Sequence, residues 1–165
     1  MDEFIKKIIL RRTIQAAFQR GKVYPDGLSQ KARDELKNSI KEELVRISGK
    51  YVNEVSEEKH LKNIEVLSQT IIRKHKRKLK NGRLRIGTAQ KLLNVFIKFL
   101  WCLGEAKEPE HCPIDRIVLT EIKSDHKWTD LQSIDEYKEV ISEIRMHIDN
   151  ESVARWEWKL WNRKA

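Results

Sequence analysis

Glycine and proline are scarce in this chain of 165 residues, which contains six glycines and three prolines. Both residue types punctuate turns, so their scarcity argues against an architecture with many tight turns and favours long elements. Long helices suit such a composition. Five tryptophans and four phenylalanines, together with many isoleucines and leucines, nevertheless provide the apolar side chains of a folded core.

Cysteine is also rare, and no long apolar run is present. Two cysteines, Cys102 and Cys112, cannot form the disulfide framework of a small secreted domain, and Cys102 fits a small core residue inside an apolar helix pattern. The longest apolar stretch, residues 92–103, is interrupted by Asn94 and Lys98 and is too short to span a bilayer. Charged residues break up positions 1–20, which excludes a signal peptide. We therefore expect a soluble, cytoplasmic protein without a membrane partner.

Acidic residues are missing from residues 73–85, the basic tract, which supplies +8 of the net charge of +9. Such a concentration of positive charge is typical of proteins that bind nucleic acid, an anionic membrane surface or an acidic protein. The alternative is a solvated helix end whose cations favour the C-terminal helix dipole. The candidate phosphate-binding residues are Arg73, Lys74, Lys76, Arg77, Lys78, Lys80, Arg83 and Arg85.

Helical periodicity extends over most of the chain and predicts one all-α domain, residues 1–165, of six or seven helices. Ser29, Ser56, Thr88, Asp115 and Ser133 are the expected N-caps. The basic tract should lie on the last turns of the helix that begins at Ser56, with Asn81-Gly82 as its end. The most apolar helix, residues 88–103, should occupy the centre. The remaining helices are expected at 3–20, 29–48, 115–123, 133–148 and 151–163.

Three polar residues interrupt the central helix on a single stripe. Lys91, Asn94 and Lys98 follow one another at i, i+3 and i+7, which places them on one helix face. This stripe is either the solvent edge of the helix or the polar lining of a cleft. In a cleft, a lysine could contact a phosphate, or act as a nucleophile if burial lowered its pKa.

The segment His111-Cys-Pro-Ile-Asp115 is a second candidate site. Asp115 stands where a helix should begin, so it is either an N-cap or a carboxylate that orients a water or stabilises positive charge near His111. A zinc site is not expected, because His111, Cys112, Cys102 and His126 lack a CxxC or HxxxH spacing. Phosphate-loop and other cofactor motifs are also missing, so we predict neither a metal nor a cofactor. The oligomeric state is left open.

The C-terminal helix carries three tryptophans. Trp156 shares a stripe with Val153 and Leu160 and should belong to the core. Trp158 lies off that face, where it would either stack on a base or a partner, or simply help to anchor the helix.

Residues 82–118 resemble the core of the helix-hairpin-helix DNA glycosylases. The resemblance rests on Leu84-Arg85-Ile86-Gly87 at the hairpin, on Lys91 in the helix after it, and on Pro113-Ile114-Asp115 further on. It implies that Gly87 lies where hairpin amides hold a DNA phosphate, that Asp115 supports cleavage of the glycosidic bond, and that Lys91 is a nucleophile. It also favours DNA over RNA. The same stretch is similar to uncharacterised bacterial proteins with a QKxxN…HxPxD pattern, which imply no activity.

Together these features predict an all-α nucleic-acid-binding protein. The basic tract would neutralise phosphates, and Lys91, Asn94, Lys98, His111 and Asp115 would form an adjacent cleft, with base excision as an extension of this function. The rival hypothesis is a non-enzymatic regulator of the defence or phage type that docks an acidic partner protein through the same tract.

Overall fold

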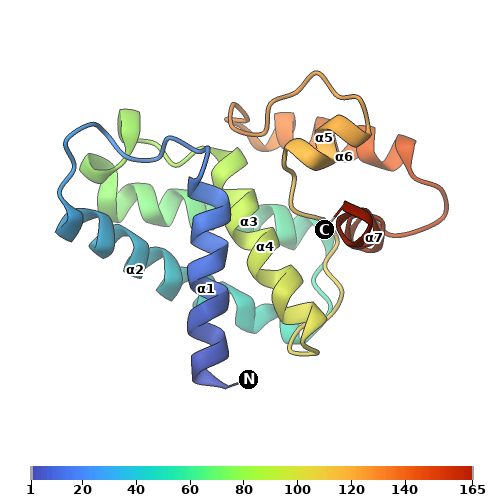
Figure 1. Ribbon diagram of the computed structural model, residues 1–165, viewed down its shortest axis with the longest axis horizontal. Helices are drawn as coiled ribbons and strands as arrows, with labels where there is room; N and C mark the ends of the chain where they lie inside the picture. Colours follow the sequence, from blue (N-terminus) through green and yellow to red (C-terminus); the bar gives the residue numbers. More distant parts are fainter. Residues whose placement is uncertain (1, 165) are drawn as a thin grey trace.

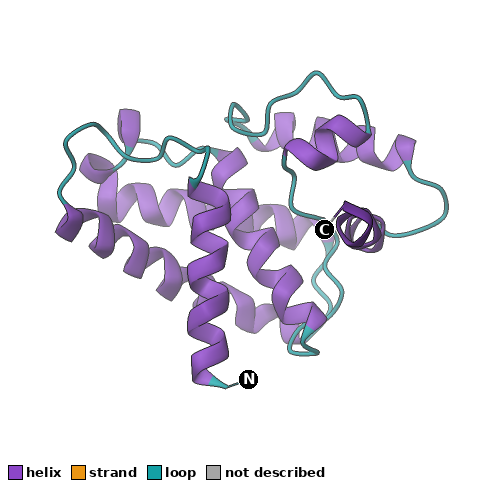
Figure 2. Ribbon diagram, in the orientation of Figure 1, coloured by secondary structure: helices purple, strands orange, loops and turns teal. Residues whose placement is uncertain are grey.

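The computed structural model describes residues 2–164, which form α-helices joined by turns and loops (Figure 1). Figure 2 shows no strand among these residues, so the predicted all-α class is confirmed. Three short 3-10 turns, η1 (Gly49–Val52), η2 (Lys76–Lys78) and η3 (Lys80–Gly82), lie between the helices. The α-helices are α1 (Glu3–Phe18), α2 (Gln30–Ser48), α3 (Glu57–His75), α4 (Ile86–Cys102), α5 (Arg116–Glu121), α6 (Ile134–His147) and α7 (Val153–Lys164).

Most helix starts are the ones that the sequence indicates. The Ser29 hydroxyl accepts a hydrogen bond from the Ala32 amide, and Ser56 caps α3 in the same way. Ser133 and Glu136 form a reciprocal capping box at α6. Asp115 caps α5, so these four predicted N-caps are confirmed.

The connection between α3 and α4 differs from the prediction. The helix that carries the basic tract ends at His75, and the tract continues through two 3-10 turns instead. This path buries the Leu79 side chain and lets the Lys80 amide donate to the Val23 carbonyl at 2.8 Å. Asn81 and Gly82 do have positive φ angles, 55° and 64°, as expected where a helical segment ends.

The central helix also begins earlier than predicted. Thr88 is a buried residue inside α4 rather than its cap, because Arg85 adopts the extended cap conformation and its carbonyl accepts from the Thr88 and Ala89 amides. The expected core position of Cys102 is wrong as well. Cys102 is exposed in the last turn of α4, beside the exposed side chains of Phe99 and Leu103.

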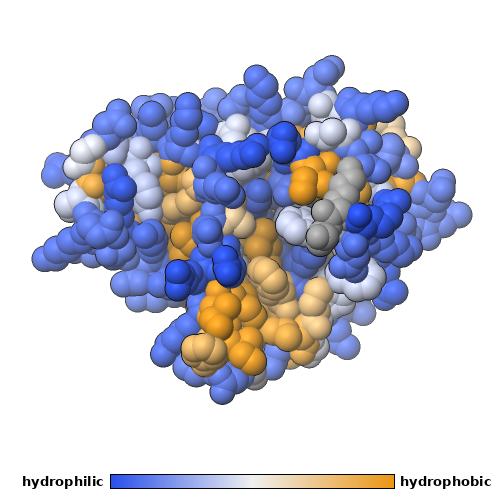
Figure 3. Space-filling model, viewed as in Figure 1, coloured by the Kyte–Doolittle hydropathy of each residue, from blue (hydrophilic) through white to orange (hydrophobic). Residues whose placement is uncertain are grey.

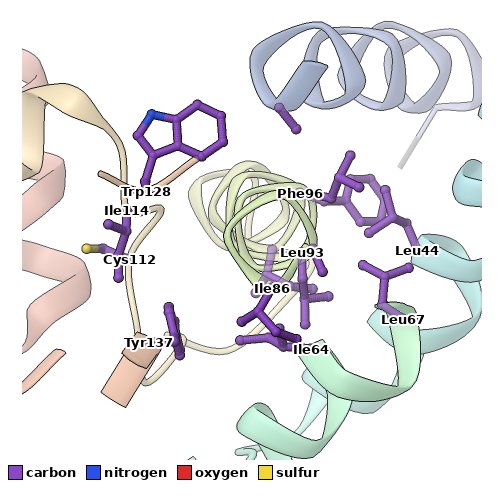
Figure 4. Packing of buried hydrophobic residues seen from close by; sticks show 14 of the residues in the cluster. Leu44, Ile64, Leu67, Ile86, Leu93, Phe96, Cys112, Ile114, Trp128 and Tyr137 are labelled. Carbon is purple, nitrogen blue, oxygen red and sulfur yellow. The ribbon is translucent and has the colours of Figure 1, made fainter. Parts of the chain in front are cut away.

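Helix α4 passes through the middle of the molecule, as expected. It packs against α1, α2 and α3, and the Leu93 and Phe96 side chains face apolar residues of α2 and α3 in Figure 4. The opposite side of the helix is covered by the second half of the chain. Its covering residues in Figure 4 are Cys112, Ile114, Trp128 and Tyr137.

The C-terminal helix α7 divides its tryptophans as predicted. Trp156 is buried with Leu160, whereas Trp158 and Trp161 are exposed. None of the helices formed by residues 2–164 combines the length and the apolar character needed to cross a bilayer.

Candidate functional site

The basic tract forms a cationic surface at the end of α3 (green, upper left in Figure 1). Two of its cations are held by carboxylates: Lys78 pairs with Glu35, and Arg85 lies 4.0 Å from Asp130 while donating to the Thr129 carbonyl at 2.8 Å. Within residues 2–164 no carboxylate forms an ion pair with the other six. These six cations are Arg73, Lys74, Lys76, Arg77, Lys80 and Arg83.

Part of this surface is hollowed into a groove, which we call the basic groove. The groove has a volume of about 550 Å³, and a smaller hollow of about 260 Å³ adjoins it and adds Lys80 to the lining. Among the described residues 2–164, no acidic residue lines either hollow. The groove is lined by Ser68, Ile72, Lys76, Asn81, Gly82, Arg83, Leu84, Arg85 and Gln132. Sequence reasoning missed Gln132, which approaches the groove from a position 49 residues away from Arg83.

In the polar stripe of α4, Lys91 and Asn94 are buried and Lys98 is partly buried, so its interpretation as a solvent edge is wrong. The Lys91 ammonium lies 3.6 Å from Asp115 Oδ2 and 4.3 Å from the centre of the Trp128 ring. Burial lowers the pKa of Lys91, and the negative charge of Asp115 opposes that effect. The structure therefore brings together the two residues that sequence reasoning had proposed as catalytic.

Asp115 has two roles at once. Its Oδ1 atom accepts hydrogen bonds from the amides of Ile117 and Val118, at 2.8 and 3.2 Å, as a helix cap. Its Oδ2 atom faces Lys91. The predicted N-cap role of Asp115 is thus observed, and its second oxygen is free to pair with Lys91; its role as a catalytic carboxylate stays a prediction.

Lys98 lies about two helical turns beyond Lys91 on α4 and pairs with a different acid. Its ammonium lies 2.7 and 2.9 Å from the carboxylate oxygens of Glu157 in α7. Burial raises the pKa of Glu157 to about 7, although Lys98 favours its charged form. Because Lys98 is occupied in this way, we leave it out of the proposed nucleic-acid surface. The sequence analysis did not identify Glu157. The only sequence feature that indicates its burial is its position among the core residues of α7.

Asn94 and His111 belong to a buried hydrogen-bond network. The Asn94 amide donates to the Tyr137 hydroxyl and the Cys112 carbonyl, at 3.0 and 2.9 Å. His111 Nδ1 lies 3.0 Å from the same hydroxyl, and His111 Nε2 lies 2.9 Å from Glu57. Both side chains are completely buried, so they fix the packing of α4 against the second half of the chain.

A second histidine, His60, packs against this network. Its ring packs edge-on against His111 with centroids 4.9 Å apart, and its Nδ1 atom lies 2.8 Å from the Tyr51 hydroxyl. Burial lowers the pKa of His60 to about 3 and that of His111 to about 4. The sequence signal for His60 is its spacing of four and seven from Ile64 and Leu67, which places it on the apolar stripe of α3.

Gly87 serves a packing contact. Its amide donates to the Leu131 carbonyl at 3.0 Å, and its Cα atom lies against the Trp128 carbonyl, so close that a Cβ atom would come within 1.7 Å of that oxygen. The Gly87 amide is therefore already bonded, and we leave it out of the proposed nucleic-acid surface.

The loop of residues 124–133 joins the basic groove to the Lys91–Asp115 pair. Trp128 covers Lys91, the Thr129 carbonyl accepts from Arg85, and Gln132 lines the groove. A change at the groove that moved this loop would therefore also change the covering of Lys91.

No protein-family model matches the chain, and searches of curated proteins and of solved structures found no relative. The resemblance of residues 82–118 to the glycosylases thus stays a prediction. Within residues 2–164, no group of three or more histidine, cysteine or acidic side chains is arranged to hold a metal ion.

Proposed function

We propose that this protein binds nucleic acid, and DNA in particular, through the basic tract. The observation that carries the proposal is the basic groove, which residues 2–164 line with three cations and no acid; two of these cations, Lys76 and Arg83, have no carboxylate partner there. Cations without carboxylate partners attract phosphates and release the counterions condensed on the nucleic acid, which is the main source of sequence-independent affinity.

The side chains of the tract favour contacts with the sugar-phosphate backbone. Its only ring is that of His75, which is half-buried and hydrogen-bonded to Ser39 at 2.7 Å. Proteins that prefer single strands stack the bases on exposed aromatic rings. We therefore expect binding to a double helix at least as tight as binding to the corresponding single strand.

Salt should weaken this binding steeply. If the six cations without carboxylate partners each neutralise one phosphate, a plot of log affinity against log salt concentration should have a slope of roughly −5. The measurement is the fluorescence anisotropy of a labelled 20-base-pair duplex, titrated with protein at several salt concentrations between 50 and 300 mM.

Reversing the charges of the groove tests the same DNA-binding proposal by mutation. Lys76→Glu, Lys80→Glu and Arg83→Glu together should abolish duplex binding at 100 mM salt. The control reverses the same amount of charge at exposed positions outside the tract, with Lys59→Glu, Lys138→Glu and Lys159→Glu. A shallow salt slope, or equal losses in the two triple variants, would contradict the proposal. If the groove variant lost an acidic protein partner but not DNA, the rival function of a protein-binding regulator would be favoured instead.

We infer base excision as a second candidate function from the position of Lys91. A buried lysine with a lowered pKa is a better nucleophile at neutral pH than an exposed one, and Asp115 lies within 3.6 Å to stabilise positive charge. For a sugar to reach Lys91, the Trp128 ring must move aside. The 124–133 loop would supply this motion when DNA occupies the groove that Gln132 lines.

The test of base excision is covalent trapping. With duplex DNA that contains uracil or an abasic site, sodium borohydride should reduce a Schiff base between Lys91 and the sugar to a stable adduct, and Lys91→Met should not form it. Asp115→Asn keeps a capping oxygen, so this variant should bind DNA normally while base release is lost. The absence of an adduct with both substrates would exclude Lys91 as a nucleophile and leave the binding proposal intact.

A further inference from the structure

The basic groove contains apolar surface as well as cations. Ile72 of α3 is half-buried and packs against the core, and the buried Leu84 also lines the groove. The Ser68 hydroxyl beside them already donates to the Leu84 carbonyl at 2.6 Å. Outside the groove, the surface over the basic tract is mostly hydrophilic (upper left in Figure 3). Phosphates bind through cations and hydrogen-bond donors, so the apolar part of the groove indicates a ligand that also has an apolar face.

Two carboxamides lie among the cations. Asn81 and Gln132 are exposed side chains that line both the groove and the smaller hollow beside it. Arg83 Nη1 donates to Gln132 Oε1 at 3.5 Å. A carboxamide offers a donor and an acceptor side by side, which is the combination that pairs with the edge of a base. Phosphate oxygens only accept hydrogen bonds, so they would use half of this capacity.

The size of the groove fits one nucleotide. Its volume of about 550 Å³, with about 260 Å³ in the adjoining hollow, lies in the range of small-ligand sites, about 300–1,000 Å³. The phosphates of a double helix lie on its convex outer surface and would contact the cations at the edge of the groove. Its bases are paired and stacked inside the helix, so they would not reach Ile72. An unpaired nucleotide can turn its base outwards and present both the flat face and the edge of that base.

We propose that the basic groove receives an unpaired nucleotide of DNA, such as one that overhangs the end of a duplex. The inference rests on the DNA binding proposed above and names the part of the DNA that this groove recognises. The phosphate would contact Lys76 and Arg83, the base would lie on Ile72, and Gln132 would bond to its edge. The adjoining duplex would contact the exposed cations of the tract that line neither hollow, which are Arg73, Lys74 and Arg77.

Fluorescence anisotropy with modified duplex ends tests this inference. A blunt 20-base-pair duplex is compared with the same duplex carrying a two-nucleotide overhang, on either the 5′ or the 3′ strand. A third form carries stable abasic analogues in the overhang, which keep its phosphates and lack its bases. The wild-type protein should bind the better of the two overhangs about tenfold more tightly than the blunt duplex, and the abasic form should lose most of this gain.

A variant without the two carboxamides locates the recognition in the groove. Asn81→Gly with Gln132→Ala keeps the net charge, and glycine accepts the φ of 55° at position 81. This variant should lower the ratio of overhang to blunt affinity from about ten to about two. Gln15→Ala with Asn162→Ala removes two exposed carboxamides outside the groove, and this control should keep the full ratio. Circular dichroism confirms that both variants are folded.

The possible outcomes separate this inference from the DNA binding on which it rests. Equal affinity for blunt and overhanging duplexes overturns the inference and leaves DNA binding in place. So does an abasic overhang that binds as tightly as complete nucleotides, since the added phosphates would then explain the gain. A folded carboxamide variant with the wild-type ratio also overturns it. A chain that binds neither form of DNA overturns the DNA-binding proposal, and this inference with it.

Discussion

Replacing Gly87 by alanine is expected to destabilise the fold by about 3 kcal/mol or more. The added Cβ atom would lie 1.7 Å from the Trp128 carbonyl oxygen and 2.9 Å from its carbon. Both are backbone atoms, so no rotamer change relieves the clash. The hydrogen bond from the Gly87 amide to Leu131 holds the two segments at this separation, and relief would break it.

The measurement for Gly87→Ala is the free energy of unfolding from urea denaturation. Gly49→Ala is the matched control, because no atom lies within 4 Å of a Cβ at Gly49 and its φ of −56° suits any residue. That control should be neutral or slightly stabilising, since alanine restricts the unfolded chain. A loss below about 1 kcal/mol for Gly87→Ala would mean that the 124–133 loop moves away at little cost. In that case hydrogen exchange should be faster at the amides of residues 128–131.

The local features of the fold could be predicted from the sequence. Ser29, Ser56 and Ser133 cap helices because their side-chain oxygens satisfy amides within three residues, which is a purely local interaction. The burial of α4 follows from its almost continuous apolar surface. The predicted N-cap of α4, Thr88, lies three residues after the observed one, because Arg85 caps the helix without a side-chain hydrogen bond and a side-chain pattern does not report that.

The long-range features of the candidate site could not be predicted in this way. Lys98 and Glu157 are 59 residues apart, and only the docking of α7 makes them partners. The spacing of Lys91, Asn94 and Lys98 defined a stripe, but a stripe of polar residues on a helix normally faces solvent. Here the second half of the chain covers it and supplies Asp115, Tyr137 and Glu157 as partners. Periodicity reports which residues share a face, and not what covers that face.

Stability is expected to fall as the pH drops below 6.5, because the folded protein keeps His60 and His111 neutral. Their folded pKa values, about 3 and about 4, lie below the usual 6.5. Between pH 6.5 and 4 the unfolded chain therefore binds protons that the folded chain does not. Each such histidine removes about 1.4 kcal/mol of unfolding free energy per pH unit. His75, whose pKa is also lowered by burial, adds to this loss.

Glu157 works in the opposite direction over part of the same range. Its folded pKa, about 7, lies above the usual 4.5, so between pH 7 and 4.5 the folded chain binds a proton that the unfolded chain does not. Acidification therefore stabilises the fold at this one group. Between pH 6.5 and 5, the two buried histidines and Glu157 leave a net uptake of about one proton on unfolding.

Three variants separate these contributions, with the unfolding free energy measured by urea denaturation at several pH values between 5 and 6.5. His111→Gln should reduce the slope of stability against pH by about 1.4 kcal/mol per unit, and Glu157→Gln should increase it by a similar amount. Met146→Gln, at an exposed position without a titratable group, should leave the slope unchanged. The two opposite changes have one cause, the burial of titratable groups between α4 and the second half of the chain. If both variants kept the wild-type slope, water would have to reach these groups, and the Lys91–Asp115 pair beside them would be open to solvent as well.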